Sequence, residues 1–381
     1  MKNLDDLTLQ ELLERLESYQ HTYIGSVPHD LCIATLNKIN RAYEFVSLCD
    51  IAGEAFVFKA IDKIDNRPLA IKVALPQYFS KSTKKHRINW GLNPFRGKDI
   101  DEPSINRQRF LNGCELHAAL YKEIANAQEE LDFYIPKLYN FTEEPCLHAE
   151  MEWIDGIHAV RWIKEKKDLI YGLKLYLKLL HATKFFHSYQ ILHRDLKSNN
   201  LLISKKDKIT IIDWTVSKLL TRENITIVGT PIGTSPYGSP KNVTYKNARD
   251  ATYPDDIYSL GYVLYEFQNG EDVPPTELDL SDILQIEKYK NELCKTLLEE
   301  LKPIFSKATH VSEHQRYQIL DEFIDDFKTA LGKLEKKYPD KKGIGQDVKQ
   351  QETEDRIKKT EEMLARIGKF IEENLSIGEQ I

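Results

Sequence analysis

The sequence lacks a long run of hydrophobic residues. The most apolar stretch, residues 169–186, is interrupted by four basic or titratable side chains: Lys174, Lys178, His181 and Lys184. It is therefore too polar to span a bilayer. Its apolar positions recur at the spacing of a buried helix, at Leu173, Tyr176, Leu177 and Leu180. The first ten residues also lack the apolar core of a secretory signal, so neither a transmembrane nor an exported protein is expected.

Cysteine is also scarce, and the chain has no net positive charge. The five cysteines are odd in number, scattered, and include no Cys-x-x-Cys pair, which favours free thiols in a reducing compartment, the cytoplasm. The chain carries 53 Lys and Arg against 59 Asp and Glu, a net charge of −6. An acidic chain gives no overall electrostatic reason to expect nucleic acid as a partner. Its 41% hydrophobic and 29% charged residues are typical of a globular protein.

What the sequence does contain is a dense group of polar residues at 193–214, which read HRDLKSNNLLISKKDKITIIDW. Four of them carry chemistry: the acids Asp195 and Asp213, the base Lys197 and the amide Asn200. Phosphoryl transfer requires a proton acceptor for the attacking hydroxyl, a cation for the migrating charge, and oxygen ligands for magnesium. This one segment supplies all of these functions.

The spacing of these groups predicts that they meet. The five residues from Asp195 to Asn200 form a loop that can turn both side chains toward one point. Residues 201–203 and 209–212 are apolar, with a polar turn between them, and this pattern predicts a β-hairpin. Such a hairpin returns Asp213 to the loop that carries Asp195.

This segment resembles the catalytic and metal-binding loops of eukaryotic-type serine/threonine protein kinases. The resemblance covers residues 43–330 and implies an α+β, two-lobed fold. The small antiparallel β-sheet lobe is expected at 43–152 and the larger, mainly helical lobe at 153–330. The resemblance also implies an enzyme that uses ATP and Mg2+, with Mn2+ as an alternative metal, to phosphorylate a protein substrate.

The resemblance assigns a role to each polar residue of the segment. Asp195 would orient the acceptor hydroxyl and take its proton, and Lys197 would stabilise the transferred phosphoryl group. Asn200 and Asp213 would bind the metal.

Lys72 is the expected phosphate ligand of the first lobe. It ends the apolar segment LAIK, where a half-buried ammonium group needs an anionic partner. In the kinase resemblance this lysine holds the α and β phosphates of ATP and pairs with a glutamate of the next helix. Glu115 has the more apolar surroundings for that role, and Glu123 has the better spacing to the following strand. We favour Glu115, and the choice stays open.

The rest of the nucleotide site is implied by the resemblance alone. The loop that would cover the phosphates, residues 50–57, has one glycine, Gly53, where the family has three. Side chains therefore occupy positions where the family uses glycine to let the backbone amides approach the phosphates closely. Met151 to Ile154 resemble the hinge between the lobes, where adenine would bond the backbone of Glu152 and Ile154. The other expected nucleotide contacts are Val57, Ala70, Met151 and Leu202.

Two residues after the metal-binding aspartate depart from the family pattern. Trp214 and Thr215 stand where the family has Phe and Gly, and Thr lacks the backbone freedom of Gly. We expect this segment to flip less readily between active and inactive states, while metal binding by Asp213 is kept.

The following segment, residues 233–240, resembles the end of a kinase activation segment. Thr234 is placed to bond Asp195 and Lys197, which is typical of serine/threonine kinases. Lys241 replaces a glutamate whose usual arginine partner we assign to Arg316. Because lysine and arginine repel, the segment must be anchored in another way.

Two further roles follow from the same resemblance. Residues 256–261, DIYSLG, resemble the buried helix whose aspartate, here Asp256, braces the catalytic loop. Arg194 is a candidate receptor for a phosphate on Thr226 or Thr230, which is a hypothesis about activation.

The flanking segments have patterns of their own. Residues 1–42 are expected to form a helical extension, with Thr8 and Glu11 as a capping box. Three strands then follow from Tyr43, and a turn at residues 65–68 joins the last two, which predicts an antiparallel meander. Ser104 is expected to cap the next helix. Two more strands are expected in IPKLYNF and CLHAEMEWI.

Two segments are candidates for partner binding. The insertion at 76–103 belongs to a stretch with eight basic and three acidic residues. This stretch is either a solvated loop or, through residues 81–98, a contact for phosphate or anionic lipid. Residues 331–381 are expected to form a charged linker and an amphipathic helix. That helix, at 352–375, docks on the second lobe, on a partner or on a membrane surface.

Two other functions compete with an active protein kinase. A weak or inactive kinase-like scaffold is suggested by the sparse glycine loop, by Trp214 and by Lys241, but every charged catalytic residue is retained. A kinase-fold enzyme acting on a small molecule or lipid is suggested by the basic insertion. The Arg and Lys of the catalytic loop, and the segment from Gly233 to Tyr237, disfavour it. The sequence does not identify the physiological substrate.

Overall fold

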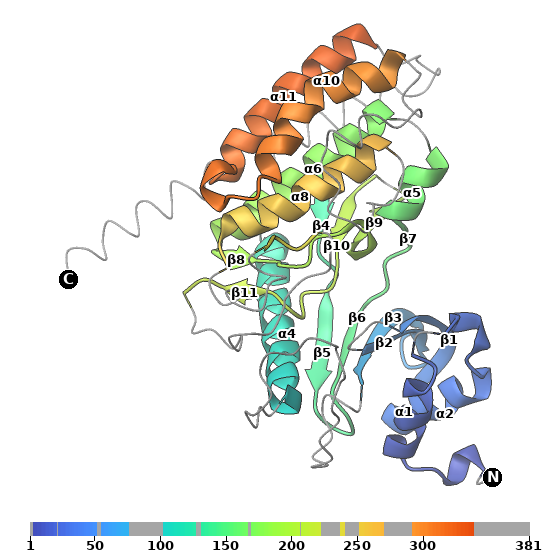
Figure 1. Cartoon of the computed structure of the whole chain (residues 1–381). Helices are drawn as coiled ribbons and strands as arrows, with labels where there is room; N and C mark the ends of the chain where they lie inside the picture. Colours follow the sequence, from blue (N-terminus) through green and yellow to red (C-terminus); the bar gives the residue numbers. More distant parts are fainter. Residues whose placement is uncertain are drawn as a thin grey trace, which may run out of the picture. The chain divides into compact units, whose positions relative to one another are not determined.

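The computed structural model describes residues 3–20, 22–51, 55–75, 102–126, 131–166, 169–205, 207–221, 237–240, 251–269 and 292–338. The chain divides into two compact units (Figure 1). Unit 1 comprises Met1–Tyr121 and Pro136–Ile154, and unit 2 comprises Lys122–Ile135 and Asp155–Ile381. The first contains a sheet and the second is mainly helical, which confirms the expected α+β, two-lobed class.

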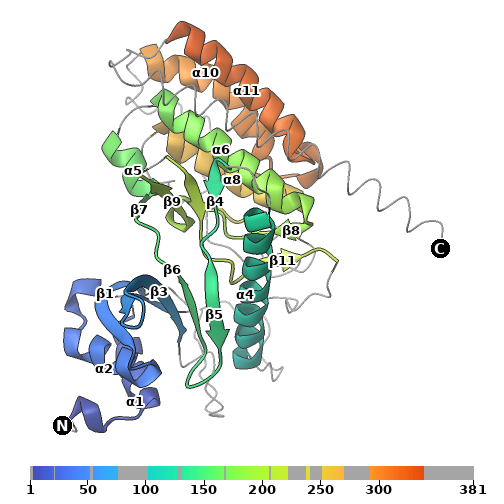
Figure 2. The same cartoon turned by 180° about the vertical axis from the view of Figure 1, so that it is seen from behind.

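Unit 1 is built on a five-stranded antiparallel sheet with strand order β1-β2-β3-β6-β5. The strands are β1 (Tyr43–Ile51), β2 (Ala55–Asp62), β3 (Arg67–Ala74), β5 (Leu138–Thr142) and β6 (His148–Glu152). Figures 1 and 2 both show β5 and β6 side by side. The expected meander and the two later strands are confirmed.

The turn between β2 and β3 lies two residues earlier than expected. It occupies residues 63–66, and Arg67 and Pro68 already belong to β3. Asn66 takes the left-handed backbone with φ 60°, which asparagine tolerates better than most residues. The Asp65 side chain accepts a hydrogen bond from the backbone N–H of Arg67 at 3.1 Å, which closes the turn.

The N-terminal segment is helical, as expected. It consists of η1 (Leu4–Asp6), α1 (Leu9–Glu17), η2 (Ile24–Ser26) and α2 (His29–Ile39). At the start of α1, the Thr8 side chain accepts from the backbone N–H of Glu11, and the Glu11 side chain accepts from that of Thr8. The predicted capping box is therefore formed.

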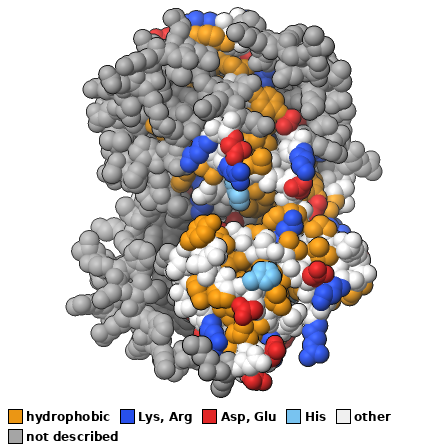
Figure 3. All heavy atoms as spheres, turned by 90° about the vertical axis from the view of Figure 1, so that its right-hand side faces the viewer, with side chains coloured by type: hydrophobic (Ala, Val, Ile, Leu, Met, Phe, Trp, Pro, Cys, Tyr) orange, Lys and Arg blue, Asp and Glu red, His pale blue; other side chains and the backbone are white. Residues whose placement is uncertain are grey.

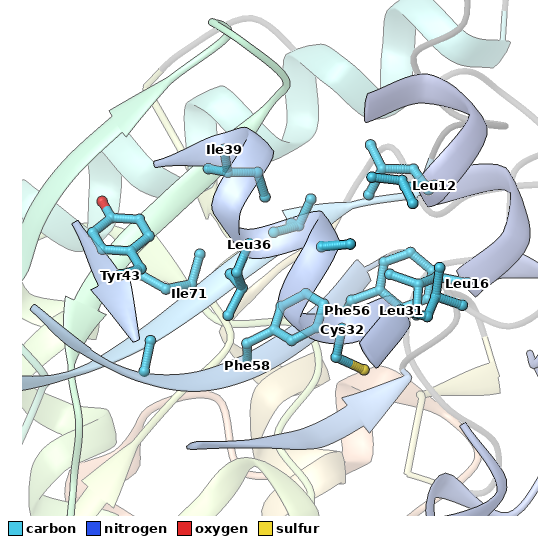
Figure 4. Packing of buried hydrophobic residues seen from close by; sticks show 14 of the residues in the cluster. Leu12, Leu16, Leu31, Cys32, Leu36, Ile39, Tyr43, Phe56, Phe58 and Ile71 are labelled. Atoms are coloured by element: carbon cyan, nitrogen blue, oxygen red, sulfur yellow. The ribbon is translucent and has the colours of Figure 1, made fainter. Parts of the chain in front are cut away.

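These helices share one hydrophobic core with the sheet. Leu12 and Leu16 of α1, and Leu31 and Leu36 of α2, are buried together with aromatic and aliphatic side chains of the strands. Figure 4 shows these leucines close to Phe56, Phe58 and Ile71. The N-terminal helices are thus an integral layer of unit 1 and not a separate appendage.

Helix α4 (Glu102–Asn126) lies between β3 and β5 in sequence. Because it begins at Glu102, Ser104 lies inside the helix, and the expectation that Ser104 caps its N-terminus is wrong. Phe110 and Cys114 of this helix pack with Ala74, Leu147 and Ala149 of the sheet region. The helix therefore contacts the sheet through its apolar side chains.

The main helices of unit 2 are α5 (Ala159–Lys166), α6 (Leu169–Ser188), α8 (Tyr253–Asn269), α10 (Glu292–Ala308) and α11 (Leu320–Lys337). The predicted stripe of α6 is buried: Leu173, Tyr176, Leu177 and Leu180 are each 5% exposed or less. Tyr176 donates a hydrogen bond to the carbonyl of Leu260 in α8 at 2.7 Å. No helix of the described residues is both long and apolar enough to cross a membrane.

The C-terminal boundary differs from the expectation. Helix α11 continues to Lys337, and its Leu331 and Leu334 are buried. Residues 331–337 therefore belong to the folded unit and not to a linker. The cause is the apolar stripe of α11, which continues from Phe327 through both leucines.

Short strands complete unit 2. A four-stranded sheet has the order β4-β10-β9-β7, formed by β4 (Phe133–Tyr134), β7 (Gly156–His158), β9 (Leu201–Ser204) and β10 (Ile209–Ile211). A second pair joins β8 (Ile191–Leu192) and β11 (Lys218–Leu219). The 3-10 turns η3 (Ser198–Asn200) and η5 (Glu313–Gln315) lie in the connections.

Candidate active site

The loop that carries Asp195 has the geometry expected from its spacing. The Nζ atom of Lys197 lies 2.8 Å from Oδ2 of Asp195. The Asn200 amide donates to the same oxygen at 2.9 Å and to the Asp195 carbonyl at 2.8 Å. The Asn200 nitrogen is thereby directed at Asp195, which turns its amide oxygen away from that carboxylate. Loop 195–200 therefore fixes a carboxylate, an ammonium and an amide in one place.

Asp256 of α8 holds this loop in place through hydrogen bonds to its backbone. Its two carboxylate oxygens accept hydrogen bonds from the backbone N–H groups of His193 at 2.9 Å and Arg194 at 2.8 Å, and His187 bonds it at 2.9 Å. Burial alone would raise the pKa of Asp256, but His187 and the backbone N–H of Arg194 hold that pKa below its ordinary value. A buried carboxylate can thus stay ionised and hold Arg194, whose φ is 66°. The expected role of Asp256 is confirmed.

His193 is fully buried and links the loop to the hairpin. Its Nδ1 accepts from the backbone N–H of Asp195 at 3.4 Å, and its Nε2 lies 3.2 Å from the carbonyl of Ile212. Burial lowers the pKa of His193 in spite of the nearby carboxylates. Because Nδ1 accepts from Asp195, Nε2 is the ring nitrogen placed to donate to the Ile212 carbonyl. In the sequence, His193 is recognisable only as part of the HRD motif. Its bridging role could not be predicted there, because the contact with Ile212 exists only once the hairpin has formed.

The β9–β10 hairpin brings Asp213 to the loop, as predicted. Leu201 pairs with Ile211 in an antiparallel register, and the backbone N–H of Ile212 donates to the Asn200 carbonyl at 3.0 Å. Asp213 follows directly and has a left-handed backbone with φ 63°. The two expected metal ligands, Asn200 and Asp213, are thus fixed to adjoining backbone segments.

Trp214 and Thr215 have well-defined contacts. The Trp214 ring is 2% exposed and makes edge contacts with His193 and Phe186, with centroids 4.7 and 5.4 Å apart. Thr215 donates to Oδ1 of Asp213 from its hydroxyl at 2.7 Å and from its backbone N–H at 3.3 Å. The hydroxyl bond was missed at the level of sequence, although Asp-x-Thr is a common pattern for a local side-chain bond.

Unit 1 presents Lys72 on one face of its sheet. Val57 and Ala149 pair directly with Lys72, and Ala70 pairs with Met151. Directly paired residues of an antiparallel sheet point to the same face. Four expected nucleotide contacts, Val57, Ala70, Lys72 and Met151, therefore share one face, while Leu69, Ile71 and Val73 point to the face that α1 and α2 cover.

The remaining hinge residues lie at the end of β6. The backbone N–H of Glu152 donates to the Lys137 carbonyl at 2.8 Å, and its side chain accepts from the Lys137 N–H at 3.1 Å. Ile154 follows and is half-buried. Leu202 belongs to unit 2, where it pairs with Thr210 in the hairpin.

The two candidate partners of Lys72 lie in different surroundings. Glu115 is exposed on α4, next to the buried Cys114. Glu123 is half-buried and accepts a hydrogen bond from the Tyr189 hydroxyl at 3.4 Å. The choice between the two acids stays a prediction.

Several sequence predictions fall outside the described residues. These are Gly53, Thr226, Thr230, Thr234 and Lys241, together with the basic residues 81–98 and the C-terminal helix at 352–375. On the face drawn in Figure 3, Lys and Arg side chains of the described residues are interspersed with Asp and Glu.

The described part of the activation-segment end is anchored on α8. Ser239 donates to Oδ1 of Asp255 at 2.5 Å, and Tyr237 donates to Glu266 at 2.6 Å. Arg316, which we assigned as the arginine facing position 241, lies with Nη1 3.6 Å from Oδ1 of Asp255. The acid that pairs with Arg316 therefore comes from α8. Lys241 lies outside the described residues, so its position opposite Arg316 stays a prediction.

The chemistry of the donors suits magnesium. An amide oxygen and a carboxylate are hard oxygen ligands, and Mg2+ is commonly held by one or two carboxylates completed by nucleotide phosphates. No cluster of three or more His, Cys, Asp or Glu side chains suited to a metal occurs within the described residues. The amide oxygen of Asn200 and the carboxylate of Asp213 therefore have the ligand chemistry that fits Mg2+.

Comparison with known proteins agrees with this geometry. The sequence model of the family described as "Protein kinase domain" matches residues 113–327. A probable serine/threonine-protein kinase PknB of Lactococcus lactis is 25% identical over 252 residues, 63% of this chain and 39% of the relative. Serine/threonine-protein kinase PrkC of Bacillus subtilis is 24% identical over 300 residues, 77% of this chain and 41% of the relative.

A third relative matches a shorter region more closely. Serine/threonine-protein kinase PknB of Mycolicibacterium smegmatis is 33% identical over 139 residues, which are 34% of this chain and 21% of that protein. The chain therefore spans about two fifths or less of the length of the relatives named here.

Proposed function

Because this chain belongs to the protein kinase domain family, we propose that it transfers the γ-phosphoryl group of ATP to serine or threonine hydroxyls of a protein substrate. The observation that carries the proposal is the pair of contacts on one oxygen of Asp195, from Lys197 and from Asn200. They fix the carboxylate beside an ammonium group. That is the arrangement that phosphoryl transfer to a hydroxyl requires.

Asp195 and Lys197 would act on the two ends of the reaction. The substrate hydroxyl oxygen forms the new bond to the γ-phosphorus as the bond from that phosphorus to the β–γ bridging oxygen breaks, and ADP leaves with that oxygen. Asp195 orients the hydroxyl and receives its proton. Lys197 places its positive charge against the transferred phosphoryl oxygens, which lowers the energy of the transition state.

Asn200 and Asp213 would hold magnesium. When bound, the ion neutralises charge on the phosphate oxygens. The chain contributes the orientation of its own ligands: the Asn200 amide nitrogen is bonded to Asp195, which turns its oxygen outward, and Asp213 is held by Thr215. Mn2+ has similar ligand preferences and is expected to replace Mg2+ in the assay.

Unit 1 would contribute the nucleotide contacts. Lys72 holds the α and β phosphates, and the small or apolar side chains on its sheet face, Val57, Ala70 and Met151, contact the adenine. A glutamate of α4, Glu115 or Glu123, is proposed to fix the Lys72 ammonium. Phosphorylation of Thr226 or Thr230 and a location in the cytoplasm stay predictions from the sequence.

The test is an ADP-release assay on the full chain with ATP, Mg2+ and a generic protein substrate. Asp195→Asn should lower kcat by about 10²–10⁴-fold, because the proton acceptor is lost. Lys72→Ala should cause a loss of similar order. The matched controls, Asp325→Asn and Lys302→Ala, alter exposed residues of α11 and α10 and should leave the rate unchanged. Equal signals from all five proteins would mean that the chain is not an active kinase.

A label-transfer assay separates the alternatives. Transfer of label from γ-labelled ATP, followed by phosphoamino-acid analysis, should give phosphoserine and phosphothreonine. Label found only in a small-molecule or lipid fraction would instead indicate a kinase-fold enzyme that phosphorylates a small molecule or a lipid. Nucleotide binding without transfer to any fraction would favour a scaffold.

A further inference from the structure

The hydroxyl of Thr215 contacts the carboxylate that is expected to bind metal. Its distance to Oδ1 of Asp213 is 2.7 Å, and the backbone N–H of the same residue reaches that oxygen at 3.3 Å. Two donors from one residue thus converge on one oxygen of Asp213. A glycine at position 215 could offer only the backbone donor.

Thr215 is held in place by the residues around it. The Trp214 ring is buried between Phe186 and His193, and the Trp214 carbonyl accepts from the backbone N–H of Ser217 at 3.0 Å. The Ser217 hydroxyl in turn donates to the carbonyl of His193 at 3.3 Å. The turn that follows Asp213 is therefore attached to the catalytic loop on both sides of Thr215.

The Arg194 side chain adds a further attachment. Its Nε donates to the carbonyl of Val216 at 2.6 Å, and Arg194 is 5% exposed. Val216 directly follows Thr215. The Thr215 hydroxyl can still move by rotation of its own side chain. A shift of the Thr215 backbone, however, would require the Trp214 ring, Ser217 and Arg194 to move with it.

We propose that Thr215 is a positioning residue for metal binding: its hydroxyl fixes Oδ1 of Asp213 and thereby presets the direction of Oδ2 as the metal ligand. The inference rests on the proposed function, because it concerns the same site. A carboxylate whose orientation is already fixed loses less rotational freedom when it binds a cation, so the affinity for the metal rises. Trp214 contributes by holding the turn.

Substitutions at one position separate the hydroxyl from the rest of the side chain. Thr215→Val keeps the branched shape and the backbone donor and removes only the hydroxyl. Thr215→Ser keeps the hydroxyl and removes only the methyl group. If the hydroxyl is what matters, serine should restore the property that valine loses.

The experiment measures metal binding without turnover. Free Mn2+ is followed by electron paramagnetic resonance during titration of the full chain in the presence of saturating ADP. Thr215→Val should weaken Mn2+ binding by about five- to tenfold, the loss typical of one hydrogen bond. Thr215→Ser should stay within about twofold of the parent. Asp213→Asn serves as the variant that removes the ligand itself.

Three outcomes have separate meanings. Equal Mn2+ affinity of the parent and Thr215→Val overturns the inference while leaving the proposed kinase function intact. Affinity lost equally in the Ser and Val variants overturns it as well, because the methyl group would then be responsible. A parent that binds no Mn2+ with ADP overturns both proposals together. Near-ultraviolet circular dichroism of each variant checks that the Trp214 environment is unchanged.

Discussion

Arg316 and Asp255 form a buried ion pair, with Nη1 of the arginine 3.6 Å from Oδ1 of the aspartate and both side chains 1% exposed. The arginine also donates to the carbonyls of His310, Pro254 and Val311. The aspartate also accepts from Ser239 and from the backbone N–H of Thr252. The Arg316–Asp255 ion pair and its hydrogen bonds thus connect α8, residue Ser239 and the loop before α11.

Replacing Asp255 should destabilise unit 2 strongly. Asp255→Ala leaves the Arg316 charge buried without its carboxylate, and such a loss lowers the free energy of unfolding by about 3–5 kcal/mol. Urea unfolding followed by tryptophan fluorescence measures the change. The matched control, Asp325→Ala, removes an exposed aspartate of α11 and should stay within about 0.5 kcal/mol of the parent. A loss for Asp255→Ala no larger than that of the control would contradict the prediction.

The N-terminal helices should be needed for the stability of the sheet. Leu16 of α1 is 0% exposed in the core shared with Phe56 and Phe58, so Leu16→Ala should cost about 2–5 kcal/mol through lost burial and a cavity. Glu14→Ala alters an exposed residue of the same helix and serves as the control. Differential scanning fluorimetry and urea titration give the two values. Equal midpoints for the two variants would show that α1 is dispensable.

Stability should fall on mild acidification because of His181. This histidine of α6 is 1% exposed, and burial, followed by the charges of Lys328 and Lys184, lowers its pKa from 6.5 to about 3. Below pH 6.5, His181 binds a proton in the unfolded chain but stays unprotonated in the folded chain. The folding stability present above pH 6.5 is therefore lost progressively as the pH falls to about 3. By pH 5 the loss is on the order of 2 kcal/mol.

The measurement is the free energy of unfolding between pH 7.5 and pH 5 for the parent and for His181→Gln. The variant should show a flatter dependence on pH, whatever its stability at neutral pH. His314→Gln, at an exposed position, should retain the slope of the parent. Identical slopes for His181→Gln and the parent would rule out this origin of acid sensitivity.

Two cysteines should resist thiol reagents in the folded chain. Burial raises the pKa of Cys146 to about 12, and burial together with the Asp30 charge raises that of Cys32 to about 11. At pH 8 far less than about 1% of either thiol is the reactive thiolate. Alkylation with iodoacetamide, read by peptide mass spectrometry, should modify both only after addition of urea. Rapid native labelling of Cys32 or Cys146 would contradict the prediction.

Local patterns predicted much of the structure. The alternation of apolar residues located β2 and β3, and the spacing of Asp195, Asn200 and Asp213 correctly indicated a loop followed by a hairpin. These features depend on neighbours in sequence, so short-range rules suffice. The capping box of α1 was predictable for the same reason, since both of its residues lie within one helical turn.

Features that depend on distant residues were predicted less well. The pairing of Arg316 with Asp255 joins residues 61 positions apart and cannot be inferred from either local segment. The start of α4 was misplaced because Ser104 has the chemistry of a cap but lies inside the helix. The extent of α11 was underestimated because its lysine-rich end resembles a linker, although Leu331 and Leu334 continue the buried stripe.

The shared core of the N-terminal helices and the sheet has a consequence for the order in which the protein can fold during synthesis. Helices α1 and α2 leave the ribosome before the strands, and their apolar faces remain uncovered until β2 and β3 emerge. The sheet itself waits for β6, which ends at Glu152. Unit 1 therefore cannot close until residue Glu152 has been made. Its first helices, α1 and α2, are the part most in need of protection from aggregation until then.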